Sequence, residues 1–375
     1  MNITRNRRVF LIPIFALIFF WSGRFSLQYS ELRVDHQVQV VENKGKALIK
    51  QVVTVKKELT IGKLEEGGSI FGQVAGLAVA SDGRIFVLDL KDKKLKIFDS
   101  TGEMLKELGR EGQGPGEWLI PAGLQLLFDQ TLIVNDGGNR KLIFMDLEGN
   151  ILREISYAKK QMMLRVTIFE DGSNCLGVEM GMAADGMSYD IAVYDGEFNK
   201  LFKIDSLQMS LPFGDVKINP FESLYDYSID PQGNIIYGRG TDYEIKYFTK
   251  EGKLFRIVKK EYRPQRISEK DKEDILKMIP ETPGINLKER IVFPQNFPAF
   301  SSLFLDEEDR LYVRTYERGK APDTYVVDVF NAEGVFIARG EFPGEGHVFK
   351  KGKLYAVEKD DEDYHYICRY QVSWK

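Results

Sequence analysis

Four side chains in this sequence have the types and spacing needed to hold a charged or ring-shaped ligand. Arg239 and Tyr243 lie in one predicted hairpin, and Arg314 and Tyr316 lie in another. A guanidinium presents a planar fork of donors to a carboxylate or sulfate group, and a tyrosine ring is a stacking surface for a sugar or a side chain. These residue types therefore predict a site for a peptide, a glycan or a small anionic ligand.

The same four side chains have a plainer alternative as solvated surface. Asp242 and Glu317 are their neighbours in the sequence, and each could pair with one of them. The corresponding hairpins of the first two repeats, described below, are short and rich in Lys, Gly and Asn. The Arg and Tyr side chains are therefore not required by the repeat, and both interpretations stay open.

Two other stretches resemble ligand-binding motifs but lack the surroundings that the chemistry needs. Gly112-x-Gly-x-Gly116 has the glycines of a phosphate loop, but no helical pattern follows whose N-terminus could face an anion. The acidic run at 358–363 lacks the alternating ligands and the turn glycine of a calcium loop. We predict a tight crossing between sheets with Trp118 wedged in it for the first, a solvated hairpin tip for the second, and no metal or cofactor.

Composition and charge exclude several classes of protein. The net charge is −4 at pH 7, so no basic surplus favours nucleic acid as a partner. Cys175 and Cys368 are the only cysteines, which excludes a disulfide framework and a Cys-x-x-Cys site. They fall in different repeats, and we predict that they never pair. Hydrophobic residues make up 43% of the chain, with 25 Phe and 17 Tyr, which is ample for a large core of strands.

A repeated unit of four short strands must position these side chains. Its clearest copy runs from Val74 to Leu108, where Asp-Gly and Thr-Gly turns separate β-rich runs. Glycine supplies the positive φ that such hairpin turns need. The first-turn residues fall at Gly83, Gln130, Gly172, Gly233, Asp309 and Gly352, and the second-turn glycines at Gly102, Gly149, Gly196, Gly252 and Gly334. Self-similarity at a period of about 40–50 residues, with four strands per unit, predicts a β-propeller.

The sixth unit lacks a fourth strand, and the N-terminal part of the chain supplies a spare one. Residues 57–62 resemble the end of a fourth strand, and they precede the first unit by the same interval that separates the first unit from the second. We therefore expect this strand to complete the blade begun by residues 346–373, because closure of the ring removes exposed sheet edges. The predicted number of blades is six.

The crossing after the first unit carries a resemblance to a known family. Residues 109–123 follow the pattern Gly-x-x-Gly-x-Gly-Pro-Gly-Glu-Trp-x-x-Pro-x-Gly, and Asp136-x-x-Asn139 and Phe297-Pro-Ala-Phe300 come later. Together they resemble the NHL-type six-bladed propellers, and within these an exported bacterial branch, over residues 52–375. The resemblance implies an all-β, six-bladed β-propeller of four-stranded antiparallel blades. It implies no single function, because propellers serve as lyases, lactonases and binding modules.

The catalytic sets of propeller enzymes cannot be assembled from this sequence. The zinc centre of amidating lyases needs inward histidines from several blades, but His36 precedes the repeats, and His347 and His365 share the last unit. The inner strands, such as 164–169 and 302–305, lack the Glu, Asn and Asp with which gluconolactonase-like propellers hold a divalent ion. We therefore expect a binding or scaffold module rather than an enzyme, with a propeller lyase or lactonase hydrolase as the alternative.

An insertion at 259–298, between the fourth and fifth units, departs most from the repeat. Ser268-Glu-Lys-Asp271 resembles a capping box, and Ile275, Met278 and Ile279 share one face of the short helix that follows. In a propeller, connections between units emerge on the same face as the hairpins between second and third strands. The insertion should therefore overhang the hairpins with the Arg and Tyr side chains, either as a lid beside a ligand pocket or as a brace over the grooves between blades.

The N-terminal residues have the features of a targeting segment. Three arginines precede the apolar run at 9–21, which is about 20 Å long as a helix and shorter than the ~30 Å hydrocarbon core of a membrane. The predicted divisions are 1–28, signal peptide or signal anchor; 29–51, linker with an edge strand; and 52–375, β-propeller. The body is then exported to the periplasm or the extracellular space as a monomer, and it contacts a membrane only through an uncleaved N-terminal segment.

Overall fold

The computed structural model describes residues 37–47, 51–64, 68–183, 186–210, 216–222, 224–279 and 286–375. The predicted signal segment at 1–28, most of the linker at 29–51, and residues 280–285 of the insertion lie outside the described residues. The compact unit discussed below is Gln37–Lys375. No helix among its described residues is long and apolar enough to span a membrane.

The first blade has the strands that the repeat predicts. They are β3 (Val74–Val79), β4 (Ile85–Asp89), β5 (Lys94–Phe98) and β6 (Met104–Leu108), hydrogen-bonded in that order as an antiparallel sheet. The turns between them place Gly83 at a φ of 95° and Gly102 at a φ of 91°, which only glycine adopts without strain. The middle strands β4 and β5 are almost entirely buried, whereas the outer strand β6 is exposed.

Five further blades repeat this arrangement. Blade two contains β9 (Pro121–Leu127), β10 (Thr131–Asp136), β11 (Lys141–Asp146) and β12 (Ile151–Ser156). Blade three contains β13 (Met162–Ile168), β14 (Asn174–Ala183), β15 (Gly186–Asp195) and β16 (Lys200–Ser210). Blade four contains β17 (Asp226–Ile229), β18 (Ile235–Gly238), β19 (Glu244–Phe248) and β20 (Leu254–Lys260). Blade five contains β21 (Ser302–Leu305), β22 (Leu311–Arg318), β23 (Thr324–Phe330) and β24 (Phe336–Pro343), and blade six contains β25 (Glu345–Lys350), β26 (Lys353–Lys359), β27 (His365–Trp374) and β2 (Gln51–Ile61).

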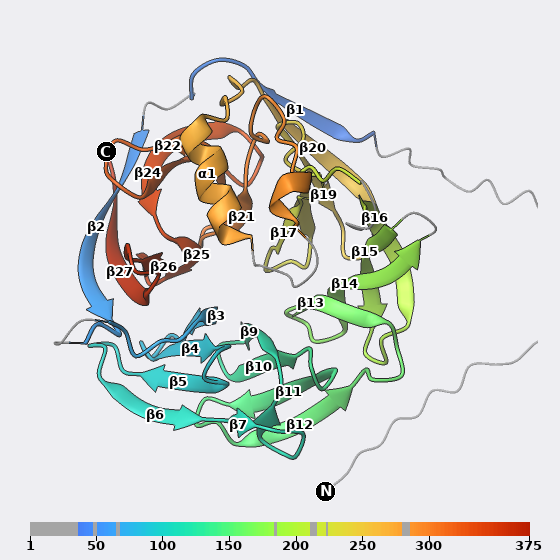
Figure 1. Cartoon of the computed structure of the whole chain (residues 1–375), viewed down its shortest axis with the longest axis vertical. Coiled ribbons are helices and arrows are strands. Elements are labelled where there is room, and N and C mark those ends of the chain that lie inside the picture. Colours follow the sequence, from blue (N-terminus) through green and yellow to red (C-terminus); the bar gives the residue numbers. More distant parts are fainter. Residues whose placement is uncertain are drawn as a thin grey trace, which may run out of the picture. The chain divides into compact units, whose positions relative to one another are not determined.

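The blades form a closed ring, as Figure 1 shows. In the part of the chain that the structure describes, six buried hydrophobic clusters each lie between two consecutive blades. The last cluster joins blade six to blade one, with Val357 and Ile367 packed among Val79, Ile85 and Phe98. Burial of apolar side chains between neighbouring sheets therefore stabilises the ring, and the predicted six-bladed propeller is confirmed.

The N-terminal strand β2 closes the ring at the predicted position. It pairs antiparallel with β27 from Val53, opposite Trp374, to Ile61, opposite Ile367. One feature was not expected from the repeat. The first residues of β2, Gln51 to Val53, also pair in parallel with Ala338 to Gly340 of β24, so blades five and six share one eight-stranded sheet.

A second N-terminal strand extends blade four. β1 (Gln39–Asn43) pairs in parallel with β20 as the fifth strand of that sheet. The side chain of Asn43 then connects to blade five, because its Nδ2 donates to the carbonyl of Gly334 at 3.0 Å and its Oδ1 accepts from the N–H of Phe336 at 2.8 Å. The N-terminal strands therefore contact the outer edges of blades four, five and six.

In two of the predicted turns, residues other than glycine adopt the positive φ angle. Gln130 occupies the hydrogen-bonded position of Gly83, but the positive φ angles of its turn fall on Phe128 and Asp129. In the third unit the predicted second-turn residue, Gly196, is wrong. The N–H of Phe198 makes the turn hydrogen bond to Asp195, and Phe198 has a φ of 59°. Its ring is buried against Tyr157 at a centroid distance of 5.0 Å, and this packing offsets the backbone strain.

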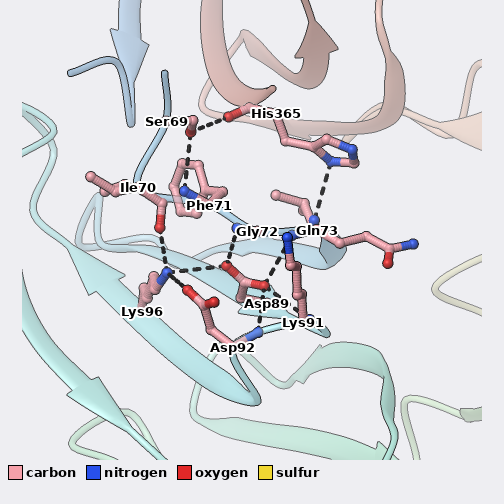
Figure 2. Close-up of polar contacts among 11 residues, drawn as sticks. Ser69, Ile70, Phe71, Gly72, Gln73, Asp89, Lys91, Asp92, Lys96 and His365 are labelled. Carbon is pink, nitrogen blue, oxygen red and sulfur yellow. Dashed lines mark hydrogen bonds and ion pairs between the residues drawn. The ribbon is translucent and has the colours of Figure 1, made fainter. Parts of the chain in front are cut away.

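The junction between blades six and one is closed by a buried polar network, shown in Figure 2. Asp89 is fully buried and accepts hydrogen bonds from the N–H groups of Gly72 (2.7 Å) and Gln73 (3.0 Å) and from Nζ of Lys96 (3.1 Å). His365 of blade six accepts at Nδ1 from the N–H of Val74 at 3.1 Å. Every charge in this network therefore has a partner, and the crossing into blade one is fixed.

The insertion contains the predicted helix. α1 (Glu269–Met278) begins with a capping box in which Oγ of Ser268 accepts from the N–H of Asp271, and Asp271 accepts from the N–H of Ser268. A short 3-10 helix, η1 (Lys288–Arg290), follows. No residue of α1 is buried, so this helix lies over the propeller as an accessory element and not as part of the core.

Candidate functional site

A cavity of about 1240 Å³ opens between blades five and six. Its walls come from β22, β23 and β24 on one side, from β26, β27 and β2 on the other, and from the C-terminal half of α1. The hairpin between β22 and β23 and the hairpin between β26 and β27 both contribute to its rim. These are hairpins between second and third strands, so the cavity lies on the face that carries the insertion.

The cavity exists because two outer strands separate. β2 and β24 are paired only from Gln51 to Val53, and beyond that point β2 follows β27 while β24 follows β23. The residues of both strands just beyond the last pair line the cavity, including Thr54 and Val55 on β2 and Glu341 and Pro343 on β24. The fork, as we call these diverging edges at 54–57 and 341–343, forms the outer end of the cavity.

Three buried polar atoms that line this cavity have no hydrogen-bond partner. They are Nε of Arg314, Oε1 of Glu358 and the hydroxyl of Tyr370, whose residue is only 3% exposed. Native proteins pair nearly all of their buried polar groups, because an unpaired group costs about 1–3 kcal/mol. Only three other buried side-chain atoms among the described residues share this condition, and their residues lie outside the cavity lining. Unpaired donors and acceptors are thus concentrated on residues that line this cavity.

Arg314 has the chemistry of an anion-binding residue. Its guanidinium carbon lies 3.7 Å from the centroid of the Tyr325 ring, and its Nη1 makes a long contact of 3.4 Å to Oγ of Ser301. No carboxylate forms an ion pair with it among the residues that the structure describes. Burial lowers the pKa of Arg314, because it removes water from the charge. A guanidinium held flat on a ring and left without a counter-ion is suited to a carboxylate or sulfate group.

The opposite wall of the cavity is acidic. Glu358 binds Nζ of Lys57 at 2.6 Å through Oε2 and leaves Oε1 without a partner. Beyond it, the hairpin tip at 360–363 contributes further carboxylates, and the hydroxyl of Tyr366 donates to Asp360 at 2.6 Å and lowers the pKa of that carboxyl. The cavity therefore combines one unpaired buried cation with a wall that attracts cations.

The four predicted ligand contacts do not form one cluster. Arg314 lines the cavity, and Tyr316 lies two residues further along β22, where it stacks on Phe297 of the insertion at 4.6 Å. Tyr243 is only 4% exposed and donates its hydroxyl to Asp328 at 2.6 Å, in the interior between blades four and five. Burial and this carboxylate raise the pKa of Tyr243 well above its usual value.

Arg239 is held by a carboxylate of the neighbouring blade. Its Nε and Nη2 each lie 2.5 Å from an oxygen of Asp205, so the guanidinium fork is occupied. The expected surface partners of the predicted side chains were Asp242 and Glu317, whereas the structure pairs Arg239 with Asp205, Tyr243 with Asp328, and Glu317 with Arg339. Sequence neighbours were the wrong guide, because blades contact each other through residues far apart in the chain.

Sequence reasoning missed the residues that share the cavity with Arg314. Tyr325, Glu358 and Tyr370 lie on three different strands, and each has the residue type of an ordinary strand or hairpin position. The acidic hairpin tip was the one available signal, and it was interpreted as solvated surface. Its placement opposite Arg314 follows only from the pairing of β27 with β2.

The Gly-rich crossing binds one of its own side chains. The carboxylate of Glu117 accepts from the N–H of Gly114 at 2.8 Å and from Nε of Arg110 at 2.8 Å. The crossing packs so closely on Trp118 that a Cβ on Gly109 would lie 2.5 Å from the ring, and Trp118 is buried between blades one and two. No group of three potential metal ligands is found within the described residues.

Comparison with known proteins supports the fold. Residues 70–172 match a family described as a 6-bladed beta-propeller. A protein from Bacteroides fragilis that is named an exported protein superposes with a TM-score of 0.54 at 13% identity, covering 89% of this chain and 100% of the other. A member of the DUF4221 family from Bacteroides vulgatus gives a TM-score of 0.53 at 13% identity, covering 86% and 98%.

A more distant likeness brings no functional information. Virginiamycin B lyase from Staphylococcus aureus gives a TM-score of 0.44 at 10% identity, covering 84% of this chain and 99% of the other. The comparison with curated proteins gives no match. The chain is similar in fold to the two Bacteroides proteins, and the NHL-type assignment stays a prediction.

Proposed function

We propose that this chain is an exported binding module that recognises a peptide, glycan or small anionic ligand in the cavity between blades five and six. Arg314 holds an acidic group of the ligand, and the ring of Tyr325 keeps the guanidinium flat. The helix α1 borders the cavity as a lid. The protein acts as a monomer, and its N-terminal segment directs export.

The observation that carries this proposal is the concentration of unpaired buried polar atoms in one large cavity. Arg314, Glu358 and Tyr370 each leave an atom without a hydrogen bond, and all three line the same space. A ligand with acceptor and donor groups would satisfy them, and the free energy of those hydrogen bonds would appear as affinity. The volume exceeds the ~300–1,000 Å³ usual for small-molecule sites, which favours an oligomeric ligand.

Export is supported by the targeting features at 1–28 and by the name of the Bacteroides fragilis propeller. Fractionation of cells that express the full chain tests it. Recovery of the propeller outside the cytoplasm is expected, and recovery in the cytoplasm would contradict the proposed location.

The binding function is tested by screening the full chain against sulfated oligosaccharides, oligouronates, peptides and small carboxylates by thermal shift and then by calorimetry. Replacing Arg314 with Ala should weaken the binding of a true ligand by about 1–3 kcal/mol, since a charge-assisted hydrogen bond is lost. The matched control is Arg153→Ala, because Arg153 also stacks on an aromatic ring, that of Phe144, at 4.1 Å, but lies on the exposed outer strand of blade two.

A third variant separates the cavity from the originally predicted set of four residues. Arg239→Ala breaks the ion pair with Asp205 and leaves the cavity unchanged. Ligand binding that depends on Arg239 and not on Arg314 would move the site to the junction of blades three and four. Equal affinity of the parent and the Arg314→Ala variant would exclude the cavity as the site.

A further inference from the structure

We infer that the ligand of this cavity is an extended peptide segment, carrying more basic than acidic side chains, that adds as a strand in the fork between β2 and β24 and places a carboxylate at Arg314. This inference rests on the proposed function, and it names the class of ligand and the mode of binding. Three features of the cavity support it, namely its free strand edges, its charge and its unpaired hydrogen-bonding groups.

The fork presents two strand edges. Residues 54–57 of β2 pair with β27 on one side, and residues 341–343 of β24 pair with β23 on one side. Neither stretch pairs with another strand on its second side within the described part of the chain. The edge of a strand carries a row of N–H and C=O groups that another extended chain can pair with. Addition of a peptide strand to such an edge is an established mode of recognition.

The other outer edges of the ring differ from this one. β6 and β12 are the outer strands of blades one and two, and their exposed side chains face away from the ring. The fork instead lines a cavity between blades five and six, where the walls of the cavity flank a paired strand. A peptide bound there buries its side chains as well as its main chain.

The charge of the cavity favours a basic ligand over an acidic polymer. Among the described residues that line the cavity, carboxylates outnumber cationic side chains nine to six. Several of the cations are already neutralised, such as Lys57 by Glu358 and Arg339 by Glu317. Arg314 alone offers a buried cation without a carboxylate partner among those residues, so the site has room for one anionic group and for several cationic ones. A sulfated or uronic polysaccharide carries an anion on most units and no ammonium, which the acidic wall would repel.

The unpaired atoms match the groups of a peptide. Nε of Arg314 needs an acceptor, which a terminal or side-chain carboxylate supplies. Oε1 of Glu358 needs a donor, which a lysine or arginine side chain supplies. The hydroxyl of Tyr370 can donate to or accept from an amide. A peptide carries all three kinds of group.

The test is a selection from a random peptide library displayed with free C-termini, using the full chain as bait and the full-length Arg314→Ala variant as the counter-selection. Enriched peptides are expected to be basic on average. Each enriched peptide is then made with N-methyl groups on alternate backbone nitrogens. Because only every second N–H of a strand faces a given edge, methylation of one alternate set should weaken binding about tenfold or more if the peptide pairs with a single edge, and methylation of either set should do so if it pairs with β2 and β24 together.

A labelled-cysteine pair locates the peptide on β2. Lys57 lines the cavity, whereas Lys106 lies on the exposed outer strand β6 of blade one, outside the fork and the cavity lining. Cys175 and Cys368 are 2% and 1% exposed, so a bulky maleimide should label only an introduced cysteine. Labelling the Lys57→Cys variant should abolish binding of a selected peptide, and labelling Lys106→Cys should leave it unchanged.

The outcomes separate this inference from the proposed function. Loss of binding with at least one alternate N-methyl set, together with the Lys57→Cys effect, supports the strand mode. Tolerance of both N-methyl sets overturns it. If no peptide distinguishes the parent from Arg314→Ala but a sulfated oligosaccharide or an oligouronate does, the inference fails and the proposed function stands. If no tested compound distinguishes the two chains, both fail.

Discussion

The two junctions that flank blade six differ in how their buried polar groups are paired. At the junction with blade one, Asp89, Lys96 and His365 form a network in which each charge or ring nitrogen named above has a partner (Figure 2). At the junction with blade five, Arg314 and Glu358 keep unpaired buried atoms around a large cavity. The ring tolerates this opening because β2 joins the outer edges of blades five and six. A propeller therefore needs closure of its circumference, and it can leave one junction open on a face.

The largest effect should come from removing the strand on which both junctions depend. Deleting residues 52–62 removes β2, including the buried side chains of Val53 and Ile61 at 1% and 3% exposure. Each such loss costs roughly 2–5 kcal/mol, and the sheet edges of blades five and six are also exposed. We expect a chain that fails to fold, as measured by circular dichroism and thermal unfolding. Deleting 29–45 removes only β1 and the Asn43 contacts, so equal melting of the two truncations would refute ring closure by β2.

The variant Asp89→Asn disrupts the polar network at the junction between blades six and one. This change removes the buried carboxylate of the ion pair with Lys96, a residue 2% exposed, and leaves its ammonium with the half-exposed Asp92 at 2.6 Å. Because one counter-ion remains, we expect a loss of about 2–3 kcal/mol, below the ~3–5 kcal/mol of a buried charge left unpaired. The matched control is Asp136→Asn in blade two, where Asp136 accepts from the side-chain amide of Asn139 and from no ammonium among the described residues, so a smaller loss of about 1–2 kcal/mol is expected. Urea unfolding measures both, and equal losses would mean that the ion pair adds nothing to the seal.

Acid should weaken both junctions, because each contains a histidine that is neutral in the folded chain. Burial lowers the pKa of His347, near the open junction, to about 4, and burial also lowers the pKa of His365 at the sealed one. A folded-state pKa below the unfolded value of about 6.5 means that the unfolded chain takes up protons first as the pH falls. For His347 the stabilisation is therefore complete above pH 6.5 and is lost as the pH falls from 6.5 to about 4, by at most about 1.4 kcal/mol per pH unit, and the effect of His365 has the same sign.

Two variants apportion that pH dependence between the junctions. His347→Phe preserves the stacking on Phe304, which lies 4.5 Å away. It should flatten the stability profile below pH 6.5 more than His365→Gln does, because burial lowers the pKa of His347 as far as about 4. Urea midpoints measured from pH 4 to pH 8 give the comparison. A profile unchanged in the His347→Phe variant would show that this side chain is already solvated in the folded protein.

The smallest predicted effect is a gain in stability, whereas the truncations and Asp89→Asn lose stability. Arg314→Met removes a buried charge that has no counter-ion among the described residues and keeps a long apolar side chain on Tyr325. We expect a gain of about 1 kcal/mol in the free energy of unfolding, because ligand-binding residues are often costly to the empty protein. The midpoint of urea unfolding measures it. A loss of similar size would mean that Arg314 stabilises the fold and is not kept for binding.

The fold could be predicted because its signals are local. The turns at Gly83 and Gly102 and the strands between them recur along the chain, and each hairpin is specified by adjacent residues. The strand that closes the ring could also be predicted, because residues 57–62 match the end of a fourth strand. Gly196 failed as a turn residue because the burial of Phe198 against Tyr157 decided the turn, and that contact joins two blades.

The site could be predicted only in part, because its decisive contacts are long-range. Arg314 was recognised by residue type, but nothing near it in the sequence shows that it lacks a counter-ion. Arg239 has the same residue type and is paired with Asp205 from the preceding blade. The cavity itself depends on the parallel pairing of β2 with β24, whose residues are nearly 300 positions apart. Short-range patterns carry no information on where two such strands separate.

The pairing of β2 with β27 sets the order of events during synthesis. Residues 51–61 leave the ribosome roughly 300 residues before their partners at 365–374. At about 5–20 residues per second, the first strand waits roughly 15–60 seconds for its partner. A nascent chain can thus assemble hairpins and whole blades, but the ring stays open until the last strand emerges. The edge of an early strand that stays unpaired for that time makes any pause before residues 365–374 emerge a point at which two unfinished chains can join each other instead.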